Sequence, residues 1–83
     1  MNKAEINCKI INLFRLRIEA LGLGSTLALF PIENCFTRRP RFWRKDGIHY
    51  FSVFMWQLNE LDADSLEQAI NTRIASARAY FGI

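Results

Sequence analysis

The chain has 83 residues, and this length predicts a single domain over residues 1–83. Hydrophobic residues make up 51% of the chain, aromatic residues 13% and charged residues 23%, a composition that excludes a disordered protein. Because a domain this small buries only about 60–65% of its unfolded surface, we expect a homodimer or a tight partner to cover part of the apolar remainder.

The location of the protein is predicted from its N-terminus and its cysteines. Charges begin at Lys3, and the longest uncharged run, ALGLGSTLALFPI, is too short for a membrane span and is interrupted by glycine and proline. Cys8 and Cys35 have no zinc-ligand spacing, and we expect both to be reduced thiols. The sequence therefore predicts a cytoplasmic protein without a membrane segment, metal or cofactor.

The first predicted element is a helix from Ala4 to Leu21, because apolar residues recur there every three or four positions. Gly22 and Gly24 follow it and are suited to end a helix. These glycines do not predict a phosphate-binding loop, since such a loop follows a strand and opens a helix.

Three strands are predicted in the middle of the chain. STLALF (residues 25–30) is a strand that Pro31 ends, and we expect it at a sheet edge. The segment IENCFTRRP (residues 32–40) either begins the second strand or forms a basic loop. Asp46-Gly47 predicts a two-residue hairpin turn. The resulting strand register has five pairs: Lys45 with Ile48, Arg44 with His49, Trp43 with Tyr50, Phe42 with Phe51, and Arg41 with Ser52.

The last predicted element is a helix from Ser65 to Phe81, capped by Asp64 with Glu67 and ended by Gly82. Its expected buried stripe consists of Leu66, Ile70, Ile74, Ala77 and Phe81. The predicted fold class is therefore α+β, a small α-β-β-β-α domain. Its three-stranded antiparallel sheet carries two helices packed on one face.

Strand alternation divides the hairpin into two faces. The first face suits packing beneath the helices and carries Phe42, Arg44, His49, Phe51, Val53 and Met55. The second face carries Arg41, Trp43, Lys45, Ile48, Tyr50, Ser52, Phe54 and Trp56. Two helices hardly cover both faces of a three-stranded sheet. Either the second face meets a partner, or its aromatic residues form the core.

A basic cluster lies within the same hairpin. Residues 38–45 contain five basic residues and no acid, whereas the remainder of the chain has a net charge of −2. Arginine and lysine bind phosphate or carboxylate groups, and tryptophan and tyrosine stack on bases or form protein hot spots. The predicted binding residues are Arg38, Arg39, Arg41, Trp43, Arg44, Lys45 and Tyr50, with Phe54 and Trp56 as further interface residues.

These residues predict a non-enzymatic protein that contacts nucleic acid or a nucleic-acid-handling protein complex. We expect no catalytic residue and no small-molecule substrate. The lone His49 has no partner of a catalytic pair in the sequence pattern, and the acids near residue 64 fall where helix-capping carboxylates are expected. The alternative is a small inhibitor or adaptor of a phage or mobile element, comparable in format to the anti-CRISPR proteins, that acts by protein–protein occlusion.

Overall fold

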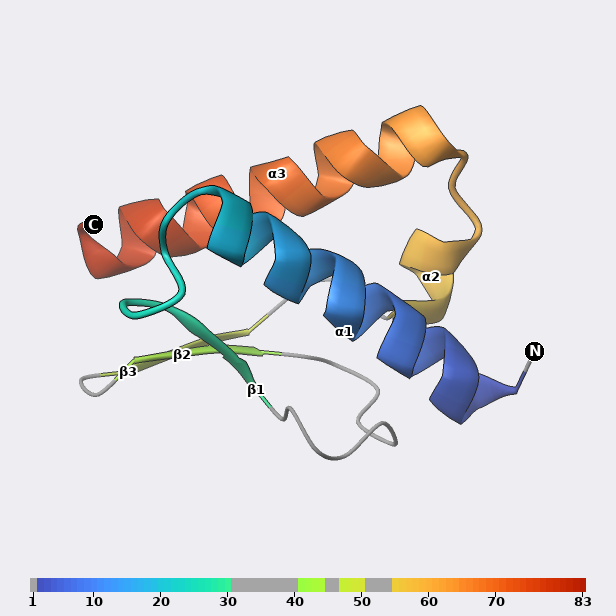
Figure 1. Cartoon of the computed structure of the whole chain (residues 1–83), viewed down its shortest axis with the longest axis horizontal. Coiled ribbons are helices and arrows are strands. Elements are labelled where there is room, and N and C mark those ends of the chain that lie inside the picture. The colour runs from blue at the N-terminus through green and yellow to red at the C-terminus, as the bar shows by residue number, and fades with distance from the viewer. Residues whose placement is uncertain (1, 31–40, 45–46, 51–54) are drawn as a thin grey trace.

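The computed structural model describes residues 2–30, 41–44, 47–50 and 55–83 (Figure 1). It is an α+β domain with one three-stranded antiparallel sheet, as predicted. Both long helices lie on the same side of the sheet (Figure 1). In chain order the elements are α1 (Lys3–Ala20), β1 (Ala28–Phe30), β2 (Arg41–Arg44), β3 (Gly47–Tyr50), α2 (Met55–Asn59) and α3 (Ala63–Phe81).

The ends of α1 follow from its flanking residues. The side chain of Asn2 accepts a hydrogen bond from the Glu5 amide at 2.9 Å, which caps the first turn. At the other end Gly22 has a φ of 72°, and the Leu23 amide donates to the Ile18 carbonyl at 2.9 Å. Such a left-handed glycine lets the chain close the helix and turn back toward β1.

The core lies between the two long helices and the inner face of the sheet. Phe42 of β2 is fully buried, and its ring meets Phe14 of α1 edge-to-face, with ring centres 6.0 Å apart. The described elements share one hydrophobic cluster. It comprises Ile10, Ile11, Phe14, Ile18, Leu27, Leu29, Phe42, Met55, Leu58, Leu66, Ile70, Ile74 and Ala77.

The register of the hairpin differs from the predicted one by two residues. Trp43 lies opposite Ile48, and Arg44 lies opposite Gly47. Gly47 is therefore a strand residue, and a side-chain carbon added to it would lie 3.4 Å from the Phe81 ring. Its role is a close approach to α3 rather than a turn conformation. Because a shift of two keeps every side chain on its face, the predicted division into two faces holds for the described strands.

The segment after the sheet also differs from the prediction. Met55 and Trp56 were assigned to the third strand but belong to α2, which buries Met55 and Leu58. The cap of α3 is Asp62 rather than Asp64, and its carboxylate accepts the Ser65 amide at 2.8 Å. This hydrogen bond lowers the pKa of Asp62.

The expectation of reduced thiols is wrong for Cys8, which is disulfide-bonded. The other cysteine of the chain is Cys35, which lies outside the described residues. Disulfides are rare in the cytosol, so the thiol argument for a cytoplasmic location no longer holds and that location stays a prediction. Within the described part of the chain, no helix is long and apolar enough to cross a membrane.

The orientation of β2 predicts losses of stability of different size for two adjacent aromatic residues. Phe42→Ala is expected to lower the free energy of unfolding by about 3–5 kcal/mol, because it empties the centre of the core. Trp43→Ala is expected to cost clearly less, since 45% of Trp43 is already exposed. Urea denaturation of both variants measures the difference. An equal or larger loss for Trp43→Ala would contradict the orientation.

Candidate nucleic-acid interface on the sheet

The outer face of β2 and β3 carries two adjacent cross-strand pairs. Trp43 pairs with Ile48, and Arg41 pairs with Tyr50. The exposed fractions are 45% for Trp43, 40% for Ile48 and 53% for Tyr50. We call these four residues the outer face. They place large apolar surface in water on the side of the sheet that α1 and α3 do not cover (Figure 1).

The two rings of the outer face are diagonal neighbours. Consecutive pairs on one face of a sheet are about 7 Å apart along the strand, and diagonal neighbours are about 7–8 Å apart. This spacing allows two bases of an extended single strand to stack, one on Trp43 and one on Tyr50. The guanidinium carbon of Arg41 lies 5.8 Å from the centre of the Tyr50 ring, so a positive charge borders the second ring.

Arg44 and His49 lie on the opposite, helix-facing side of the same strands. The guanidinium carbon of Arg44 is 5.8 Å from the centre of the Phe81 ring. The His49 ring stacks on Tyr80, with ring centres 4.6 Å apart and planes inclined by 30°. The structure therefore separates Arg44 from the aromatic residues with which the sequence analysis grouped it, and it gives His49 a packing partner on α3.

The remaining predicted residues fall into two groups. Arg38, Arg39, Lys45 and Phe54 lie outside the described residues. Trp56 is 52% exposed but belongs to α2, which packs against α1 and α3. Of the predicted binding residues, the structure thus brings together Arg41, Trp43 and Tyr50.

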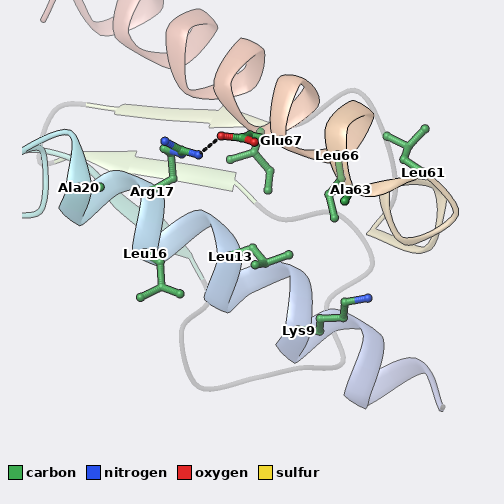
Figure 2. A pocket seen from close by; sticks show the side chains of 10 residues that line it. Lys9, Leu13, Leu16, Arg17, Ala20, Leu61, Ala63, Leu66 and Glu67 are labelled. Atoms are coloured by element: carbon green, nitrogen blue, oxygen red, sulfur yellow. Dashed lines mark hydrogen bonds and ion pairs between the residues drawn. The ribbon is translucent and has the colours of Figure 1, made fainter.

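A second exposed surface, which the sequence analysis missed, is a groove between α1 and α3 (Figure 2). It has a volume of about 700 Å³ and is lined mainly by apolar side chains. Leu16 and Leu61 at this groove are 64% and 41% exposed. The available signal was Leu16, an apolar residue three positions after Leu13 in the predicted first helix.

The groove is crossed by an ion pair. Arg17 Nη2 of α1 lies 2.6 Å from Glu67 Oε1 of α3 (Figure 2). Glu67 is exposed and Arg17 is partly exposed, so solvent screens this pair and it contributes at most about 1 kcal/mol to stability. Its main consequence is positional, because it links the two helices above the core.

The acids around the start of α3 have a structural role. Asp62 caps the helix, and Asp64 lies in its first turn, where a negative charge complements the helix dipole. Among the described residues, no group of three or more His, Cys, Asp or Glu side chains is placed to hold a metal ion.

Comparison of the chain with protein-family models, with curated proteins and with solved structures finds no match.

The separation of the two arginines predicts different effects on stability. Arg44→Ala is expected to lower the free energy of unfolding by about 1 kcal/mol, because it removes a cation and its methylenes from the Phe81 ring. Arg41→Ala is expected to cost less, since Arg41 lies on the outer face. Thermal unfolding of both variants tests this order. A larger loss of stability for Arg41→Ala would contradict the assignment of Arg44 to the helix-facing side and of Arg41 to the outer face.

Proposed function

We propose that the chain is a non-enzymatic protein that binds single-stranded nucleic acid, free or within a nucleoprotein complex, through the outer face. The observation that carries this proposal is the pair of half-exposed rings, Trp43 and Tyr50, at diagonal positions on adjacent strands. A flat sheet surface reaches the faces of bases only when they are unstacked, which favours a single strand over a duplex.

The energy of binding would come from stacking and from phosphate contacts. Each base stacked on an aromatic ring contributes about 1–3 kcal/mol, so two rings supply about 2–6 kcal/mol. Arg41, whose guanidinium carbon lies 5.8 Å from the centre of the Tyr50 ring, would contact a phosphate next to the base on that ring. Arg38, Arg39 and Lys45 remain proposed phosphate contacts from the sequence. Each contact to a single strand contributes about −0.7 to the salt slope, so these four residues predict a slope near −2.8.

The alternative function is occlusion of a protein partner by a small inhibitor or adaptor. The groove between α1 and α3 favours it, because two exposed leucines border an apolar surface on the side of the molecule away from the outer face. A second copy of the chain would also fit this surface. Binding there would depend on apolar burial and would persist at high salt, unlike binding to phosphates.

The two tryptophans of the chain allow a matched fluorescence test. In the Trp56→Phe variant, Trp43 alone reports from the outer face, and in Trp43→Phe, Trp56 alone reports from α2. Titration with short single-stranded RNA and DNA of mixed sequence is expected to quench Trp43 and leave Trp56 nearly unchanged. The quenching should weaken with salt, with a slope near −2.8.

A further variant tests the second ring. Tyr50→Ala, in the Trp56→Phe background, is expected to weaken binding by roughly ten-fold to one hundred-fold, the equivalent of one stacked base. Absence of Trp43 quenching at low salt would refute the proposal. Quenching of Trp43 that does not depend on salt would indicate binding through burial of apolar surface rather than through phosphate contacts.

A further inference from the structure

A small pocket opens beside Trp43, where β1 begins and β2 ends. Its volume is about 280 Å³. Ala28 lies directly opposite Trp43 in the register of β1 with β2, and its small side chain leaves space next to the indole. The residues that line the pocket are Gly24, Ser25, Thr26, Leu27, Ala28, Trp43 and Arg44.

The turn after α1 contributes hydrogen-bond donors to the lining. The hydroxyl of Thr26 and the amides of Thr26 and Leu27 all donate to the Leu23 carbonyl, which closes the turn after α1. By contrast, the hydroxyl of Ser25 and the amides of Gly24 and Ser25 form no hydrogen bond with the described residues. Residues 24–26 are exposed, so within the described part of the chain these three donors have no protein partner.

The charge of the lining points to an anion. Among the described residues that line the pocket, Arg44 is the charged one and none carries a carboxylate. Main-chain amides and hydroxyls are groups that proteins use to bind phosphate oxygens, and a positive charge nearby favours the anion. The pocket also shares Trp43 with the outer face, so a group bound there would lie beside a base stacked on that ring.

We propose that this pocket holds a backbone phosphate of the nucleotide strand, next to the base that stacks on Trp43. The inference rests on the proposed function and adds a direction to it, because the strand would continue from the outer face toward the turn at residues 24–28. Arg44 would favour the phosphate through its charge rather than through a direct contact, because its guanidinium packs on Phe81 on the helix-facing side and its Nη1 is buried.

The test uses a charge placed in the pocket and the same charge placed elsewhere. Ser25→Asp adds a carboxylate to the lining, and Ser76→Asp adds one on the exposed surface of α3. Both are made in the Trp56→Phe background and titrated with the same single-stranded RNA and DNA. Ser25→Asp is expected to weaken binding about ten-fold more than Ser76→Asp. It should also reduce the magnitude of the salt slope by about 0.7, the value of one phosphate contact.

A neutral variant separates charge from bulk. Ser25→Asn is close in size to Ser25→Asp, and it is expected to bind almost as well as the parent, because its amide still donates hydrogen bonds. Circular dichroism establishes that each variant is folded. Equal affinity and equal salt slope for Ser25→Asp and Ser76→Asp would overturn the phosphate pocket, as would an equal loss for Ser25→Asn and Ser25→Asp. Because Trp43 would still be quenched in those cases, the proposed function would survive; absence of any quenching would remove both.

Discussion

The contact between Phe42 and Phe14 sets the orientation of the whole sheet. Phe42 is fully buried under α1, and strand geometry then turns its neighbours Arg41 and Trp43 to the opposite side. The pairing of β2 with β3 gives Ile48 and Tyr50 the same outward direction. Leu29 of β1, which lies opposite Phe42 and is also buried, reinforces this inner side, so the outer face follows from the burial of the inner one.

The size of the chain explains why such a surface stays exposed. Two helices cover one side of a three-stranded sheet, and the described chain places both long helices on the same side (Figure 1). The molecule consequently presents two different surfaces to solvent. One is aromatic and bordered by Arg41, and the other is the apolar groove between α1 and α3. The first suits bases and phosphates, whereas the second suits only another apolar surface.

The two long helices and the division of the strands into faces could be predicted because they depend on periodic patterns. The register could not, since Asp46-Gly47 resembles a turn whereas Gly47 pairs with Arg44 in the sheet and lies close to Phe81, a contact between distant segments. A five-residue helix such as α2 is too short to show a period of its own. For the same reason Trp56 was assigned to the sheet. The pocket beside Trp43 and the groove at Leu16 both form between segments far apart in sequence, so no local pattern reveals them.

The central claim is that ligand binds on the outer side of the sheet, and amide chemical shifts measured by NMR test it most directly. A single-stranded oligonucleotide added to labelled protein should shift the amides of β2 and β3 and of the turn at residues 24–28. The chemical shifts of the amides of Leu13, Leu16 and Ile70, which line the groove between α1 and α3, should stay unchanged. Shifts concentrated around that groove, or no shifts at low salt, would contradict the account.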